Sequence, residues 1–171
     1  VRVGDLPDSS LVSVRIADNR RLCAATPAHL QRHGPPRHPS DPPQFDCLTL
    51  SSEASQIRGW AFRMPTEGGG TEVVYLKPGG PLDCSDGQAL HDWCLSGYGI
   101  AWRSTWEVES EIAAGRLVAV LADFAAPPNG IYVVFPQRKH MPLRVRLWIE
   151  YLKQQYAQPA FWQGRLSLLH N

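Results

Sequence analysis

Residues 82–104, LDCSDGQALHDWCLSGYGIAWRS, limit the possible folds more than any other stretch of the sequence. A helix of about three turns is expected here, because Ser85 or Asp86 can accept hydrogen bonds from the N–H groups that a first turn leaves unpaired. Gly97 supplies a left-handed residue that ends the helix. The apolar side chains share one face, which is typical of a helix that lies on a sheet. They are Ala89, Leu90, Trp93 and Cys94, with Gln88, His91, Asp92 and Ser96 on the polar face.

A strand and a second helix are predicted directly after this helix. Ile100-Ala101-Trp102 is a short apolar run of the kind found in buried strands, and Ser104 with Glu107 forms a capping box for a helix over residues 105–114. A β-rich run follows at residues 117–121. Alternation of helix and buried strand at this spacing predicts an α/β sheet.

Polar residues at the ends of the predicted strands are the first candidates for a binding site. In α/β sheets, ligands bind beyond the carboxyl ends of parallel strands, where helices begin and unpaired N–H groups point outward. The candidates are Ser51 and Ser52 after a strand at 45–50, then Ser85 and Asp86, and then Trp102, Arg103 and Ser104. Purely structural interpretations stand beside these: helix caps for Ser85 and Asp86, a core residue for Trp102 and a surface charge for Arg103.

The composition excludes several classes of function. With 17 basic and 16 acidic residues among 171, the chain has no charge excess that would hold nucleic acid or an anionic membrane. No apolar run approaches the length of a membrane span, and the first residues lack a signal-peptide pattern. The hydrophobic fraction of 43% supports a globular core. The cysteines form no C-x-x-C pair, and Cys23, Cys47 and Cys94 sit in apolar runs, which indicates reduced core thiols in a cytosolic protein.

The remaining segments extend the same α/β plan. Val1-Arg2-Val3 is predicted to be the tail of a strand that begins before the sequence does, so a fragment is expected. The longest helix is expected after Pro142, with Val145, Trp148, Ile149, Leu152 and Tyr156 on its buried face. The other expected elements are strands at 11–16 and 21–25 around a turn at Asp18-Asn19, a short helix capped by Thr26 before Gly34, a hairpin joining 60–62 to 73–76, and a strand at 131–135 after a turn at 127–130.

Metal-binding and enzymatic interpretations each lack a required residue. Residues 83–87 are similar to the start of a calcium loop, but Cys94 occupies the position of the required bidentate glutamate. His29 and His33 lie four residues apart without a third ligand, so a solvated pair is expected rather than a metal site. No G-x-S-x-G motif or activated cysteine is present, and a catalytic triad would need scattered residues such as Ser52, Asp86 and His91. No enzyme, cofactor or metal is therefore predicted.

The order and spacing of the motifs resemble the second half of the effector-binding domain of LysR-type transcriptional regulators. The resemblance implies an α/β fold like that of a type 2 periplasmic binding protein, with two lobes, two crossover strands and a small ligand in the cleft. The first lobe would be incomplete, and the family's N-terminal winged helix-turn-helix would be absent. The matching stretches, which cover about residues 1–157, are VRVGDLPDSSLVSVRIADNRRLCAATPAHLQRHG, WAF, SDGQALHDWCLSGYGIAWRSTWEVESEIAAGRLVAVL and IYVVFPQRKHMPLRVRLWIEYL.

The resemblance also implies a division into lobes and a set of effector contacts. Residues 1–17 and 131–157 would be the remnant of lobe I, residues 18–130 would form lobe II, and residues 158–171 would be a C-terminal tail. Thr26 is excluded from the cleft, because a crossover strand leaves the cleft before reaching it. By position in the family, the cleft would be lined by Gly4, Asp5, Ser51, Ser52, Ser85, Asp86, Tyr98, Trp102, Arg103 and Ser104.

The function that follows from the resemblance is ligand sensing in a bacterial, cytoplasmic regulator. A small-molecule effector, such as a small carboxylate or an aromatic acid, would bind between the lobes. A dimer or tetramer of the full-length protein would pass the change to DNA through the absent N-terminal domain. The alternative is a dimerisation module without a ligand of its own, which an exposed apolar helix face would favour. No membrane contact and no catalytic activity are expected.

Overall fold

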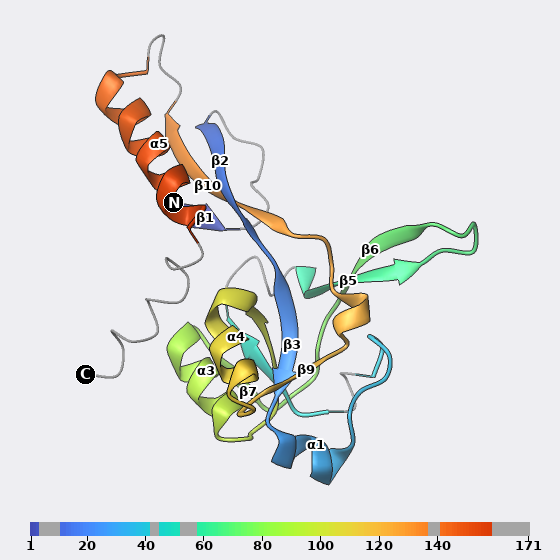
Figure 1. Cartoon of the computed structure of the whole chain (residues 1–171). Helices are drawn as coiled ribbons and strands as arrows, with labels where there is room; N and C mark the ends of the chain where they lie inside the picture. Colours follow the sequence, from blue (N-terminus) through green and yellow to red (C-terminus); the bar gives the residue numbers. More distant parts are fainter. Residues whose placement is uncertain (4–10, 42–44, 52–57, 137–140, 159–171) are drawn as a thin grey trace. The chain divides into compact units, whose positions relative to one another are not determined.

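The computed structural model describes residues 1–3, 11–41, 45–51, 58–136 and 141–158 (Figure 1). The chain divides into two compact units, one formed by Val1–Arg20 with Pro128–Asn171 and the other by Arg21–Pro127. Within the described ranges, no helix is both long and apolar enough to span a membrane. Apart from Gln158, the predicted C-terminal tail lies outside the described residues.

The second unit is built on a five-stranded mixed sheet with the order β7-β4-β8-β3-β9. Strand β4 pairs in parallel with both β7 and β8, whereas β3 runs antiparallel to β8 and β9. The predicted α/β sheet is therefore confirmed, with strands at β3 (Arg21–Ala25), β4 (Cys47–Leu50), β7 (Leu82–Cys84), β8 (Ile100–Ser104) and β9 (Val118–Val120).

Two helices, α3 (Gly87–Leu95) and α4 (Thr105–Ala113), pack on one face of this sheet. The predicted capping residues begin both helices, with Asp86 rather than Ser85 as the N-cap of α3. Gly97 has a φ of 79°, as expected for the residue that stops α3. The core between these helices and the sheet consists of Ala24, Leu48, Leu90, Cys94, Ala101, Val108 and Leu117.

The opposite face of the sheet carries a second core. It is covered in part by the predicted hairpin, which is confirmed as β5 (Trp60–Pro65) paired with β6 (Thr71–Leu76) and which projects from the unit (Figure 1). A short 3-10 helix, η2 (Ala122–Phe124), packs there as well. The buried residues of this core are Cys23, Ala25, Cys47, Trp60, Phe62, Ile100 and Val120.

Helix α1 (Pro27–His33) begins as predicted but differs in one respect. Thr26 caps it by accepting a hydrogen bond from the His29 N–H at 3.2 Å, and Pro27 occupies the first turn. The expectation of a solvated histidine pair is wrong for His29, which is only 1% exposed and stacks on His33 with ring centroids 4.6 Å apart. The helix is short and its inner face rests on the core, so its third residue is buried. No group of metal-binding side chains occurs among the described residues.

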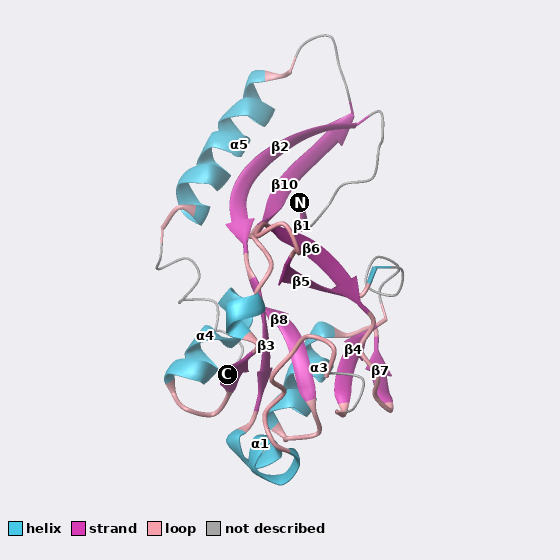
Figure 2. Cartoon of the chain, turned by 90° about the vertical axis from the view of Figure 1, so that its right-hand side faces the viewer, coloured by secondary structure: helices cyan, strands magenta, loops and turns pink. Residues whose placement is uncertain are grey.

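The first unit consists of a three-stranded antiparallel sheet, ordered β1 (Arg2–Val3), β10 (Asn129–Pro136) and β2 (Leu11–Asn19), with helix α5 (Leu143–Tyr156) running along it (Figure 2). The turns predicted at Asp18-Asn19 and at 127–130 are wrong in part, because Asp18 and Asn19 pair with Gly130 and Asn129 across the sheet. Cross-strand pairing outweighs the local turn propensity at these residues. The Asn19 side chain also donates a hydrogen bond to Asn129 Oδ1 at 3.0 Å.

Helix α5 buries a narrower face than its spacing predicts. Ile149 is 3% exposed and packs with Ile16, Ile131 and Val133, as expected for the core of this unit. Trp148, which was predicted to be buried, is 48% exposed. The three-stranded sheet of this unit contacts only one stripe of the helix, so the neighbouring apolar stripe remains uncovered in the described structure. That stripe consists of Leu143, Leu147, Trp148 and Tyr151.

Candidate functional site

Three of the predicted site residues lie at one edge of the five-stranded sheet. Ser51 follows β4, Ser85 follows β7 and Ser104 ends β8. Because β4 is parallel to both neighbours, the carboxyl ends of the three strands meet at the same edge. The Ser51 N–H donates to the carbonyl oxygen of Cys84 at 2.6 Å, which ties two of the strand ends together. We refer to this edge as the carboxyl edge of the sheet.

At this edge, Asp86 is the N-cap residue of α3. Its Oδ1 accepts from the N–H groups of Gln88 at 2.7 Å and Ala89 at 3.2 Å. The capping interpretation of the sequence is thus confirmed for Asp86. Ser85 and Asp86 are both solvent-exposed, so their polar atoms remain accessible from outside the protein. The carboxyl edge therefore combines the exposed Ser85, the partly buried Ser51 and the buried Ser104 with the first turns of two helices.

Arg103 is buried, so it is not the surface charge that was one of its two interpretations from the sequence. It shares a sheet face with Ala101, beneath α3 and α4, and is 7% exposed. Its Nη2 donates to Glu107 Oε1 at 2.7 Å, while Glu107 Oε2 accepts from the Ser104 N–H at 3.0 Å. The Glu107 half of the predicted capping box is therefore present, and the same carboxylate neutralises Arg103.

Trp102 points to the opposite face of the sheet, as the alternation of a strand requires. Its ring is half-buried against the second core and lies 6.5 Å, centroid to centroid, from the ring of Trp60. The guanidinium carbon of Arg21 lies 4.7 Å from the Trp102 ring centroid. Trp102 therefore packs against the core and also makes a cation–π contact with Arg21.

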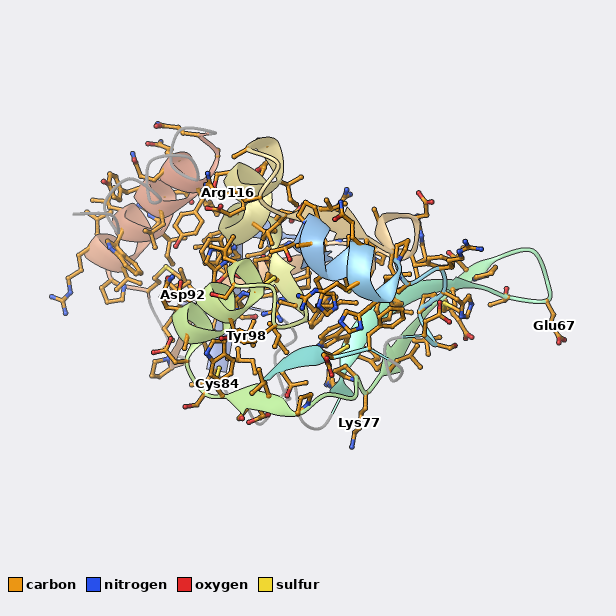
Figure 3. All side chains as sticks on the ribbon, turned by 90° about the horizontal axis from the view of Figure 1, so that it is seen from below. Glu67, Lys77, Cys84, Asp92, Tyr98 and Arg116 are labelled. Carbon is orange, nitrogen blue, oxygen red and sulfur yellow. The ribbon has the colours of Figure 1, made fainter. Side chains whose placement is uncertain are left out.

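Tyr98 does not join the other predicted site residues. It precedes β8, whereas Ser104 ends the same strand, and five extended residues span roughly 17 Å. Tyr98 therefore lies at the amino edge of the sheet, near the end of α3, with 58% of its surface exposed (Figure 3). The resemblance to the family placed Tyr98 in the cleft together with Trp102 and Arg103, but the length of β8 separates it from Ser104. Gly4, Asp5 and Ser52 lie outside the described residues.

Sequence patterns also missed polar residues between α3 and α4. His91 was assigned to the wet face of α3, but it is half-buried, and its Nδ1 finds no hydrogen-bond partner in the described structure. Burial, and then the nearby charge of Arg103, lower the pKa of His91. Glu111 is 5% exposed and accepts from Arg116. Because His91 and Glu111 sit on helical faces that look polar in sequence, only the helix packing reveals their burial.

The cysteines behave as core residues, as predicted. All four thiols are free, and Cys23, Cys47 and Cys94 are buried. Burial raises the pKa of Cys47 and of Cys94 to about 12. Cys84 is only partly buried at the end of β7, where its Sγ lies 3.1 Å from the Asp86 carbonyl oxygen. No described cysteine therefore combines high exposure with a cationic neighbour that would activate it.

This mixed α/β architecture is that of a type 2 periplasmic-binding-protein-like domain, the fold of known LysR regulatory domains. The family model "LysR substrate binding domain" matches residues 1–157. The chain belongs to this family, which confirms the resemblance seen in the sequence.

Characterised relatives are transcriptional regulators. The chain is 34% identical over 158 residues to the HTH-type transcriptional regulator DmlR of Escherichia coli K12, a match that covers 92% of this chain and 50% of DmlR. The regulatory domain of CrgA from Neisseria meningitidis superposes with a TM-score of 0.71 at 28% identity, over 91% of this chain and 74% of that domain. Full-length AphB of Vibrio cholerae superposes with a TM-score of 0.68 at 26% identity, over 91% of this chain and 50% of AphB. The chain spans about half the length of the curated relatives it matches.

Proposed function

We propose that this chain is the ligand-sensing part of a bacterial LysR-type transcriptional regulator. The observation that carries the proposal is the carboxyl edge of the sheet, where Ser51, Ser85 and Ser104 converge beside the first turns of α3 and α4. Hydroxyl groups and backbone N–H groups at strand ends are the donors that α/β proteins use to hold small ligands, and of these three serines Ser85 is the exposed one. Family membership supports the same function, since the matched model describes a substrate-binding domain.

The proposed effector is a small acid, because helix N-termini carry a positive partial charge that favours anions. Ser51, Ser85 and Asp86 would line the site, with the buried Ser104 and Arg103 and the half-buried Trp102 as supporting residues. By resemblance, Gly4, Asp5 and Ser52 would contribute as well. Tyr98 is left out because it lies at the other edge of the sheet.

In the proposed mechanism, residues 1–17 and 131–157 belong to lobe I and residues 18–130 to lobe II. Effector binding would favour one arrangement of the lobes by its higher affinity for that arrangement. The full-length protein, acting in the cytoplasm as an oligomer, would transmit the change to a DNA-binding domain.

Substitution of Ser85 tests the site directly. We expect Ser85→Ala to weaken binding of a small acid, measured by tryptophan fluorescence during titration with a panel of carboxylates and aromatic acids. The free energy of unfolding should fall by no more than about 1 kcal/mol, since Asp86 and not Ser85 caps the helix. Ser96→Ala is the matched control, because Ser96 is an exposed serine at the other end of α3. Equal affinities in the two variants would remove Ser85 from the site.

Self-association is the second candidate function, and the apolar stripe on α5 favours it. Leu143, Leu147 and Tyr151 are each more than half exposed, at 59%, 59% and 56%, and recur every four residues. The occupant we propose is a second copy of this chain, with the two α5 helices antiparallel. Arg146 and Glu150 flank the stripe, and an antiparallel copy would place Arg146 of each chain beside Glu150 of the other.

Sedimentation equilibrium distinguishes this second function from ligand sensing. Leu147→Glu should abolish association, whereas Val73→Glu on the exposed hairpin should not. Arg146→Glu and Glu150→Arg should each weaken association, and the double exchange should restore it. A wild-type chain that stays monomeric at high micromolar concentration would rule out α5 as a self-association surface.

A further inference from the structure

Arg21 lies at the carboxyl edge of the sheet, although no sequence pattern singles it out. It is the first residue of β3 and pairs in register with Ser104, the last residue of β8. Because β3 runs antiparallel to β8, the start of one strand meets the end of the other. Arg21 is therefore a basic residue within the same edge that holds Ser51 and Ser85.

The guanidinium of Arg21 is held in place, and no described residue forms a salt bridge with it. It stacks over the Trp102 ring at 4.7 Å, and its Nε is buried with no hydrogen-bond partner in the described structure. Glu107 is the carboxylate close enough to influence it. Each oxygen of Glu107 already accepts one hydrogen bond, Oε1 from Arg103 at 2.7 Å and Oε2 from the Ser104 N–H at 3.0 Å. No salt bridge or hydrogen bond reaches the Arg21 guanidinium among the described residues.

Two positive charges therefore share one carboxylate at this edge. Arg103 forms the salt bridge with that carboxylate, and its side chain is only 9% exposed. Arg21 is more exposed, and its Nε has no hydrogen-bond partner among the described residues. Burial, and then repulsion by Arg103, lower the pKa of Arg21, while Glu107 opposes the shift. A guanidinium remains protonated in proteins, so this environment places an incompletely compensated charge where an external anion can approach.

We propose that Arg21 binds a carboxylate group of the effector and thereby selects organic acids over neutral analogues. The inference rests on the proposed ligand-sensing function and adds the residue that recognises the ligand's charge. Stacking on Trp102 orients the planar fork of donors before the ligand arrives, so little side-chain freedom remains to be lost on binding. A carboxylate can accept two parallel N–H bonds from such a fork, which a lysine cannot offer.

Paired acids and amides test the proposal. The 171-residue chain would be titrated with succinate and benzoate, and with succinamide and benzamide, by following backbone amide shifts in ¹⁵N-labelled protein. We expect at least one acid to bind, and its affinity to fall on the order of 10- to 100-fold in Arg21→Gln, the range for losing a charge-assisted hydrogen bond. Arg21→Lys should lie between Arg21→Gln and wild type. Arg37→Gln removes the same charge at an exposed loop residue and should bind like wild type.

The possible results separate the two proposals. Undiminished acid binding by Arg21→Gln would overturn the role of Arg21 while leaving the ligand-sensing function intact. Binding of the amides as tightly as the acids would overturn the selection for charge. Failure of all four probes to bind the wild-type chain would overturn both the acid assignment and the proposed function. If Arg21→Gln proved unfolded by circular dichroism, the Arg21→Lys variant would decide, and wild-type affinity in it would refute recognition by the guanidinium fork.

Discussion

Removal of the negative charge of Glu107 should destabilise the second unit far more than an ordinary surface substitution. In Glu107→Gln, the side chain keeps its length, but its amide can supply only one acceptor oxygen. The wild-type carboxylate uses both oxygens, for Arg103 at 2.7 Å and for the Ser104 N–H at 3.0 Å. The variant must therefore lose one of these bonds and leave the charge of Arg103 uncompensated.

The expected loss follows from the burial of the pair. The side chains of Arg103 and Glu107 are 9% and 21% exposed, so water can screen the abandoned guanidinium only weakly. Breaking a buried ion pair from one side typically costs about 3–5 kcal/mol. Partial access of water to Glu107 favours the lower end, and we expect the free energy of unfolding to fall by about 3 kcal/mol.

Chemical denaturation followed by far-ultraviolet circular dichroism would measure this loss, with Glu109→Gln as the control. Glu109 is an exposed acid on the same helix, and its substitution should change stability by less than about 0.5 kcal/mol. The double variant Arg103→Met with Glu107→Gln should be more stable than Glu107→Gln alone, because it removes the unpaired charge. A loss below about 1 kcal/mol in Glu107→Gln, or strictly additive effects in the double variant, would refute the reasoning.

Three further predictions follow from the same unit. Gly99→Ala should destabilise the protein strongly, because a Cβ there would overlap the Asp46 carbonyl oxygen. Gly68→Ala should be tolerated, because its Cβ would meet no atom within 4 Å. Thermal melting of both variants would show the contrast. The pKa of His91 in the folded protein lies below its unfolded value of 6.5, so the unfolded chain binds the proton more readily. The free energy of unfolding should therefore decrease as pH falls below about 6.5, and it should decrease less in His91→Gln. Equal dependence of the free energy of unfolding on pH in the two proteins between about pH 7.5 and 5.5 would contradict this. In the folded protein at pH 8, Cys84 should react with a thiol reagent much faster than Cys47 and Cys94, because a pKa of about 12 keeps those two buried thiols protonated. Equal reaction rates for all thiols would contradict this and show that the core opens readily.

Local sequence patterns predicted most of the second unit, because its signals are short-range. The caps at Thr26 and Asp86, the stop at Gly97 and the hairpin around residues 66–70 depend on backbone groups only a few residues away. The carboxyl edge could also be anticipated, since alternating helices and strands imply parallel strand ends. Ser51, Ser85 and Ser104 were found together for that reason.

Residues whose role depends on distant partners could not be placed in this way. Arg21 and Glu107 are 86 residues apart, and nothing in either local sequence indicates that they share an electrostatic environment. Tyr98, which the family resemblance grouped with Trp102 and Arg103, lies at the other edge of the sheet, because the strand β8 is extended between Tyr98 and Ser104. Asp18 and Asn19 have strong turn propensity, yet a partner strand more than 100 residues away makes them part of a sheet.

The sequence by itself determined the helices, most of the strands and the family, because hydrophobic period, caps and motif order are properties of neighbouring residues. Only the tertiary structure decided which charges are buried and which are satisfied. Arg103 and Arg21 are both arginines on strands. Arg103 lies under two helices and pairs with a carboxylate, whereas Arg21 rests on a tryptophan and pairs with no carboxylate among the described residues. Burial and pairing depend on what the fold brings from elsewhere in the chain, so they could only be read from the packed molecule.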